Sequence, residues 1–131
     1  MSAREKHIRQ WLEKANEDRQ AMERLMEGDP ILEMACFHAQ QCVEKALKGF
    51  LTAHDCHVEK THDLADILEL CVEVDPTFEQ FDQTCEALTP FAVDARYPGP
   101  KNPDTIEEAR QLIGAADHVY QFTREVLDLD S

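Results

Sequence analysis

The segment of residues 37–48 carries a row of polar side chains whose types and spacing could serve chemistry. His38, Gln41, Lys45 and Lys48 follow one another at steps of three and four residues. On a helix these positions share an arc of about 80°, and we expect that arc to lie opposite the apolar stripe. Imidazole, amide and ammonium groups in such a row can hold a phosphate or an acidic partner. The alternative is an ordinary solvated face, which every amphipathic helix has.

Two further groups of residues could carry chemistry, and each also has a purely structural interpretation. Asp18 lies on the apolar stripe of its own segment, where a pairing with Arg96 or His62 would make a buried structural ion pair. His54, Cys56 and His57 fall close together, and imidazole and thiolate are ligands that zinc accepts. Their spacing matches no metal motif, so we expect no metal and no other cofactor.

Hydrophobic periodicity predicts the elements that must position these residues. Apolar residues recur at helical spacing in five segments, namely residues 3–27, 30–52, 61–72, 76–92 and 105–128. Five helices joined by short links favour an all-α fold, an antiparallel up-and-down helical bundle of four to five helices. The length of 131 residues is that of one domain, so we expect a single bundle domain spanning residues 1–131.

Capping residues and prolines predict where the helices begin and bend. Asp29, Thr61, Asp75 and Thr105 each precede a predicted helix and are residue types that accept hydrogen bonds from a first helical turn. Pro90 is expected to kink the fourth helix near its end.

Charge and composition narrow the classes of protein to consider. The formal net charge is −14, from 13 Lys and Arg against 27 Asp and Glu, which excludes general nucleic-acid binding. Residues 63–95 contain nine acids and no Lys or Arg, whereas residues 37–62 balance three bases with three acids, so an anion would be accepted only in the second stretch. No apolar run approaches the roughly 20 residues that span a bilayer. We therefore expect a cytoplasmic protein without a membrane partner, in which the five cysteines are reduced and mostly buried.

Three stretches carry a resemblance to a known family: FHAQQCVEKALK at 37–48, THDL at 61–64 and ARYP at 95–98. In this order the chain resembles the HEPN family (higher eukaryotes and prokaryotes nucleotide-binding domain). The resemblance implies an all-α bundle, usually a homodimer, often encoded with a minimal nucleotidyltransferase in toxin-antitoxin-like pairs. Many members are metal-independent RNases whose motif is an Arg followed a few residues later by a His. Here no His follows Arg96 until His118, which favours a role other than catalysis.

The resemblance therefore implies a nucleotide-binding or nucleotidyltransferase-partner module. The residues it assigns to the binding surface are His38, Gln41, Lys45, Lys48, Thr61, His62, Asp63, Arg96 and Tyr97. One alternative is an RNase that pairs Arg96 with a displaced His118 or His62. Another is a purely structural homodimer in which the polar row of residues 37–48 is buried across a two-fold axis. We expect a homodimer on a further ground, because the apolar stripe of Cys36, Ala39 and Val43 exceeds what one short bundle covers.

Overall fold

The computed structural model describes residues 2–58, 60–92 and 105–128, and within these ranges it is helical, without a strand. The helices are α1 (Ala3–Arg24), α2 (Leu32–Ala53), α3 (Leu64–Val74), the 3₁₀ helix η1 (Pro76–Phe81), α4 (Asp82–Leu88), the 3₁₀ helix η2 (Thr89–Ala92) and α5 (Ile106–Leu127). The predicted all-α bundle is confirmed. None of the helices in these ranges is both long enough and apolar enough to span a membrane.

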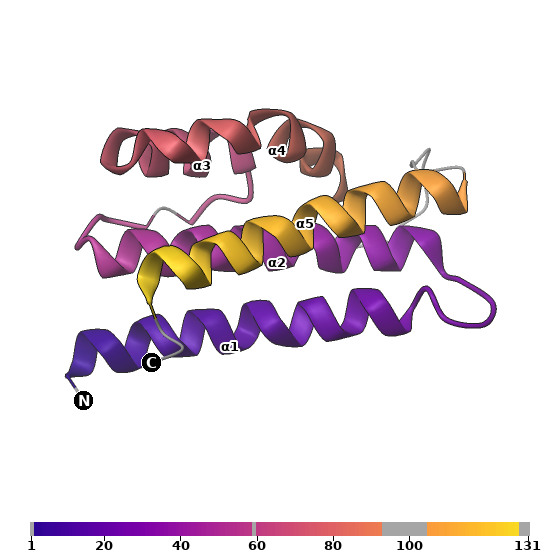
Figure 1. The fold of residues 1–131 in the computed structure, drawn as a ribbon, viewed down its shortest axis with the longest axis horizontal. Coiled ribbons are helices and arrows are strands. Elements are labelled where there is room, and N and C mark those ends of the chain that lie inside the picture. The colour runs from indigo at the N-terminus through magenta and orange to yellow at the C-terminus, as the bar shows by residue number, and fades with distance from the viewer. Residues whose placement is uncertain (1, 59, 93–104, 129–131) are drawn as a thin grey trace.

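Helix α2 is the central element of the bundle (Figure 1). Helix α1 runs antiparallel along it on one side, α5 lies beside it, and α3, η1 and α4 form a layer on the side opposite α1. Because α2 is covered from several directions, it is buried on almost all of its circumference. Of the polar row that we expected to lie opposite the core, Lys48 is buried and His38, Gln41 and Lys45 are half-buried, so the row does not lie on a fully exposed face. Gln40 and Glu44, which are not part of that row, are buried as well.

Aromatic packing holds the layer of α3, η1 and α4 onto α2 and α5. The ring centroid of Phe78, in η1, lies 4.3 Å from that of Phe50 in α2. It lies 5.2 Å from that of Phe122 in α5, in an edge-to-face arrangement. Phe81 adds a second edge-to-face contact with Phe122 at 5.1 Å. Such pairs contribute beyond the area they bury, so η1 is fixed from two directions.

Helices α1 and α2 approach closely at Gly49. A Cβ atom at this position would lie 2.5 Å from Leu12 Cδ2 and 3.2 Å from Trp11 Cβ. Both distances are shorter than an ordinary carbon–carbon contact. The absence of a side chain at Gly49 therefore permits the two backbones to pack at this distance.

The helix starts agree only in part with those predicted. Asp75 and Thr105 are N-caps as expected: Asp75 Oδ1 accepts from the Thr77 backbone N–H, and Thr105 Oγ1 accepts from that of Glu108. Hydrogen bonds from the hydroxyl and the backbone N–H of Thr77 hold the pKa of Asp75 below its ordinary value. Thr61 is not an N-cap.

The N-cap of α3 is instead Asp63, whose Oδ1 accepts from the Ala65 N–H. Asp29 was also wrong as an N-cap, because α2 begins two residues beyond Pro30 and its N-cap, Ile31, provides no side-chain hydrogen bond. A backbone bond from Ile31 N–H to the Leu25 carbonyl closes this loop.

The predicted fourth helix is divided in three. Residues 76–81 form η1, residues 82–88 form α4, and residues 89–92 form η2, which contains Pro90. Proline cannot donate an intrahelical bond, and the change to 3₁₀ geometry one residue before Pro90 is consistent with the expected distortion.

The apolar stripe that we expected to drive dimerisation is covered within the chain. Cys36, Ala39 and Val43 have no exposed surface, because α1, the α3–α4 layer and α5 surround α2. The homodimer stays a prediction, and the apolar stripe no longer supports it. Cys42, Cys71 and Cys85 are also buried free thiols. Burial raises the pKa of all four buried thiols, that of Cys36 and of Cys85 to about 12.

Candidate functional site

Two polar clusters flank α2, and each is built around one buried carboxylate. The first, the Asp18 cluster, consists of Asp18, His38 and Lys45. Asp18 Oδ1 lies 2.8 Å from His38 Nδ1, and Asp18 Oδ2 lies 2.6 Å from Lys45 Nζ. The Asp18 side chain is 9% exposed. Asp18 thus forms the buried ion pair expected of it, with Lys45, and also binds His38. His62 binds Glu44 instead, and Arg96 lies outside the described residues.

The second, the His62 cluster, consists of Gln40, Gln41, Glu44, Lys48 and His62. Glu44 Oε1 lies 2.8 Å from His62 Nδ1, and Glu44 Oε2 accepts from Lys48 Nζ at 3.1 Å. Gln40 Nε2 donates to Glu44 Oε1 and to the His62 carbonyl, at 3.3 and 3.1 Å. Gln41 Nε2 donates to Gln40 Oε1 at 2.7 Å. The cluster is therefore a continuous hydrogen-bonded network from the half-buried Gln41 to His62.

The His62 ring faces solvent, and the buried Glu44 holds it from within the protein. Its side chain is 65% exposed, whereas that of Glu44 is 5% exposed. Since a carboxylate accepts, Nδ1 of His62 carries the shared proton and Nε2 is available to a ligand. Lys48 Nζ neutralises Glu44 and also lies 5.8 Å from the centroid of the Trp11 ring, in a cation–π arrangement.

Thr61 and Asp63 support His62 on either side. Thr61 Oγ1 accepts from the Asp63 N–H at 3.1 Å, and Asp63 caps α3. These bonds fix the backbone that carries His62, while Glu44 fixes its ring. Thr61 and Asp63 therefore have a structural role in this arrangement.

The charges of Lys45 and Lys48 are already matched. Each ammonium group pairs with a different buried carboxylate, Asp18 for Lys45 and Glu44 for Lys48. A phosphate at either lysine would compete with that carboxylate. Arg96 and Tyr97, which the family resemblance assigns to the binding surface, lie outside the described residues.

His118 and His54 each pack against an aromatic ring. His118, considered for an RNase site, stands edge-on to Phe81 at 5.4 Å between centroids. His54 packs on Phe50 at 4.5 Å, and Cys56 Sγ lies 3.6 Å from the His54 carbonyl oxygen. Within the described ranges, no three His, Cys, Asp or Glu residues converge as metal ligands.

Two buried residues of the His62 cluster were not predicted from the sequence. Gln40 and Glu44 were not singled out, although they are spaced one helical turn apart, with Lys48 one turn further. That spacing of amide, carboxylate and ammonium groups is the signal that could have found them. A helix buried on both sides must satisfy its polar residues internally, which this one does.

Comparisons with known proteins agree with the helical fold. The model of the HEPN domain family matches residues 8–126. The chain therefore belongs to the HEPN domain family. No curated protein matches its sequence.

Two solved structures resemble the chain over most of its length. The crystal structure of TT1696 from Thermus thermophilus superposes with a TM-score of 0.73 at 30% identity, covering 90% of this chain and 96% of that one. The crystal structure of ST0689, an archaeal HEPN homologue, superposes with a TM-score of 0.71 at 23% identity, covering 90% of this chain and 95% of that one.

Proposed function

We propose that this HEPN domain is a non-catalytic module that binds a nucleotide at the His62 cluster. The observation that carries the proposal is an exposed imidazole fixed from beneath by a buried ion pair. His62 is 65% exposed, yet its Nδ1 binds Glu44, which in turn binds Lys48. Burying an ion pair stabilises a fold less than apolar residues of similar size would. The pair therefore supports a positioning role for the ring above it.

The chemistry of the cluster suits a nucleotide better than a bare phosphate. His62 Nε2 and the amide of Gln41 offer hydrogen bonds to the polar edge of a base or to a sugar hydroxyl. The matched charges of Glu44 and Lys48 leave no surplus cation unless His62 is protonated. We expect the phosphates to depend on residues such as Arg96 and Tyr97, which the family resemblance assigns to the same surface.

Calorimetric titration with ATP, GTP and AMP tests the proposal. His62→Ala should weaken binding about tenfold, the value of one hydrogen bond to a polar ligand group, while the far-ultraviolet circular dichroism is unchanged. His57→Ala, in the loop before Thr61, is the matched control and should bind like the wild type. No heat with any nucleotide, or equal affinity in His62→Ala and the wild type, would overturn it.

The RNase alternative has its own test. With single-stranded RNA and no metal, we expect no cleavage above a blank, because the family motif lacks its His after Arg96. Reproducible cleavage by the wild type that is lost in Arg96→Ala would instead establish an RNase.

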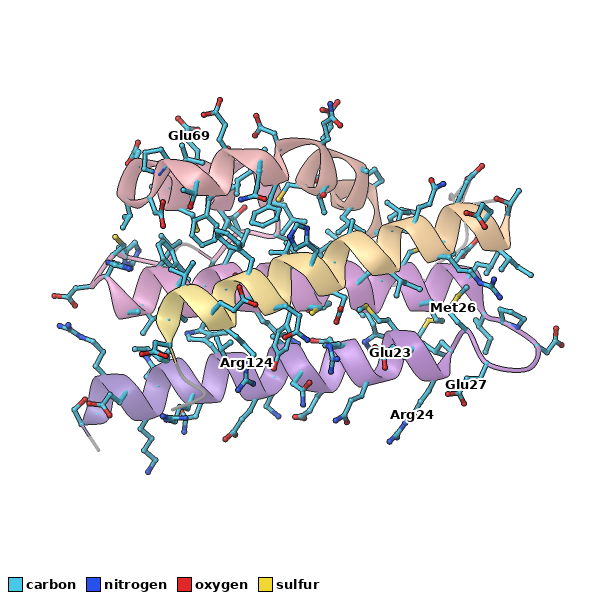
Figure 2. The ribbon with its side chains drawn as sticks, viewed as in Figure 1. Glu23, Arg24, Met26, Glu27, Glu69 and Arg124 are labelled. Atoms are coloured by element: carbon cyan, nitrogen blue, oxygen red, sulfur yellow. The ribbon has the colours of Figure 1, made fainter. Side chains whose placement is uncertain are left out.

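A second candidate function is docking to a nucleotidyltransferase partner, as in toxin-antitoxin-like pairs. The observation that favours it is the acidic outer face of the α3–η1–α4 layer (Figure 2), where these carboxylates are exposed: Asp66, Glu69, Glu73, Glu79, Asp82 and Glu86. Such a face attracts a basic protein surface. A minimal nucleotidyltransferase encoded beside this chain should bind it at low salt, and Glu69→Lys should slow the association. Glu27→Lys, an equal charge change three residues beyond the end of α1, should have no such effect.

A further inference from the structure

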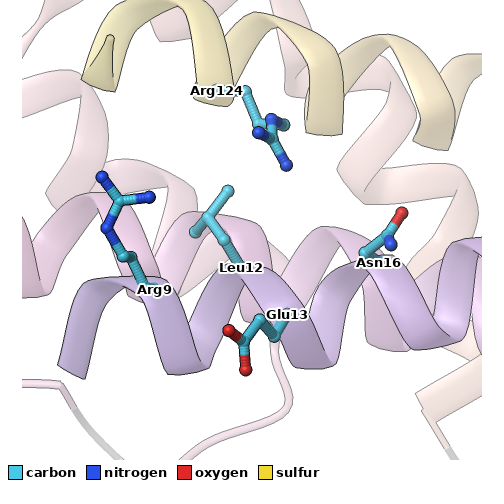
Figure 3. Close-up of a pocket in the computed structure, with 5 residues that line it drawn as sticks. All are labelled: Arg9, Leu12, Glu13, Asn16 and Arg124. Carbon is cyan, nitrogen blue, oxygen red and sulfur yellow. The ribbon is translucent and has the colours of Figure 1, made fainter. Parts of the chain in front are cut away.

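A groove runs between α4 with η2 on one side and α5 on the other, apart from both polar clusters. Its volume is about 470 Å³, within the roughly 300–1,000 Å³ of sites that hold an organic group. The hollow between α1 and α5, where Leu12 lies between Arg9 and Arg124 (Figure 3), is smaller, at about 200 Å³. The α4–α5 groove is therefore large enough for several side chains of another molecule.

The α5 wall of the groove is one face of a helix over two turns. Its lining residues are Glu108, Gln111, Leu112 and Ala115. They stand at positions i, i+3, i+4 and i+7, which share one face of a helix. Helices that pack against a neighbouring helix present side chains at this spacing.

The opposite wall has the same organisation. Gln83, Thr84 and Ala87 of α4 and Phe91 of η2 line it, at positions i, i+1, i+4 and i+8. Two helical faces therefore border the space, and the described residues leave that space open. A third helix is the element that fits between two such faces, since its side-chain ridges pack into the grooves of both.

The floor of the groove is apolar. Ala87 is exposed, Leu112 and Ala115 are half-buried, and Phe91 closes the groove from beneath, with 4% of its surface exposed. Small side chains at Ala87 and Ala115 leave room for larger ones from a partner. Covering the exposed apolar surface with such side chains would be favourable.

The rim of the groove is acidic. Glu108 is exposed on the α5 side, and Gln83 also lines a second hollow, of about 620 Å³ between the start of α3 and α4, together with Asp82 and Glu86. Residues 63–92 include no Lys or Arg. Arg110 of α5 is exposed but lines neither hollow. A partner that places Lys or Arg side chains along this rim is therefore favoured over an acidic one.

The geometry points to this groove as the docking site for a basic amphipathic helix of a partner protein. Large apolar side chains of that helix lie over Ala87, Leu112 and Ala115, and its basic side chains lie near Glu86 and Glu108. Amphipathic helices dock into apolar grooves through anchors at this i, i+3, i+4, i+7 spacing. The inference rests on the second candidate function, partner docking, and adds the surface and the kind of segment that would bind.

Fluorescence anisotropy with a synthetic helix at physiological salt tests the groove in the absence of any nucleotidyltransferase. The probe is a labelled peptide of about 18 residues, long enough to form a helix, with leucines on one face and lysines on the other. A scrambled peptide of the same composition keeps the charge but loses the apolar face. It should bind at least about tenfold more weakly, because aligned leucines are no longer buried together. A peptide with glutamates in place of the lysines should not bind, because the rim repels it.

Substitutions on the protein locate the peptide. Ala87→Arg places a bulky side chain with the same charge sign as the peptide at an exposed position of the groove, and should weaken binding at least about tenfold. Ala3→Arg adds the same charge at the first residue of α1 and should bind like the wild type. Glu108→Gln should weaken binding about threefold, the value of one exposed ion pair. Glu107→Gln removes the neighbouring exposed carboxylate, which does not line the groove, and should have a smaller effect.

Four results would overturn the docking site. They are no binding of the leucine–lysine peptide, equal affinity for the ordered and the scrambled peptide, equal affinity in Ala87→Arg and the wild type, or a dimer that Ala87→Arg converts to a monomer. The last result would assign the groove to a second copy of the chain. Failure of the peptide to bind rejects the groove alone, whereas failure of a nucleotidyltransferase to bind rejects the second candidate function and leaves the peptide result standing.

Discussion

Two buried carboxylates determine the chemistry of single residues in this protein. Asp18 and Glu44 each bind one lysine and one histidine, so each lysine is neutralised and each imidazole is oriented. Removing one partner leaves an unpaired charge in a low-dielectric site, whereas replacing both by apolar groups is often tolerated. Comparing a single substitution with the double substitution therefore separates the effect of a buried pair on stability from its effect on binding.

Lys48→Met should lower the free energy of unfolding by about 3 kcal/mol, because Glu44 then lies buried without its cation. The double variant Glu44→Leu with Lys48→Met should recover most of that loss, yet still lose nucleotide affinity because His62 is no longer oriented. Urea denaturation and calorimetric titration measure the two quantities. A double variant that binds nucleotide like the wild type would show that Glu44 does not position His62.

The buried thiols predict a loss of stability at alkaline pH. Their raised pKa means that, above the ordinary thiol pKa of about 8.5, the unfolded chain loses protons that the folded protein keeps. Stability is then fully present below about pH 8.5 and falls as pH rises toward about 12, the pKa of Cys36 and Cys85. Each thiol contributes up to about 1.4 kcal/mol per pH unit.

Urea midpoints at pH 8, 9 and 10 measure this slope. Cys85→Ala should flatten it, whereas Leu88→Ala, a cavity in the same helix without loss of a thiol, should lower stability by the same amount at each pH. A slope unchanged in Cys85→Ala would refute this account.

At the scale of elements, hydrophobic periodicity was enough to predict where the helices lie in the sequence, but not how many faces of each helix are buried. Apolar spacing found all five helical segments, because 3.6-residue periodicity follows directly from burying one face. It could not show that α2 is buried on several faces, since its polar residues satisfy one another through Gln40, Glu44 and Lys48. Hydrogen bonds between polar groups far apart in sequence, such as Asp18 with Lys45, leave no periodic signal.

Two glycines in helices should respond oppositely to the same substitution. Gly49→Ala should destabilise the protein by about 1 to 3 kcal/mol, because its Cβ would contact Leu12 and Trp11 of α1. Gly114→Ala, in α5 where nothing lies within 4 Å of the added atom, should stabilise it by up to about 1 kcal/mol. Thermal denaturation of both variants checks the pair. A destabilising Gly114→Ala would contradict the helix-propensity argument.

The charge of −14 acts at the scale of the whole molecule. Much of it lies on the layer formed by α3, η1 and α4, where residues 63–92 include no Lys or Arg. Repulsion between like charges on one layer destabilises the compact state and is screened by salt.

Raising sodium chloride from about 20 to 200 mM should therefore raise the melting temperature, since the Debye length falls toward 8 Å. Glu69→Lys, on the outer face of α3 (Figure 2), should raise the melting temperature at low salt and reduce the salt effect. Glu27→Lys, which changes the net charge equally but lies near Arg24 of α1 in sequence, should do so less. A melting temperature that falls with salt would show that ion pairs outweigh repulsion.

The central place of α2 also determines the order in which the molecule opens. Helices α1, α3, α4 and α5 all contact α2, so its backbone amides reach solvent only when those helices have separated from it. The amides of α2 should exchange with deuterium only through global unfolding, whereas those of the short α4, which lies in the outer layer (Figure 1), should exchange through local opening. Added denaturant should accordingly accelerate exchange steeply in the middle of α2 and only weakly in α4. The stability of the whole domain can then be measured from a few amide protons near Val43.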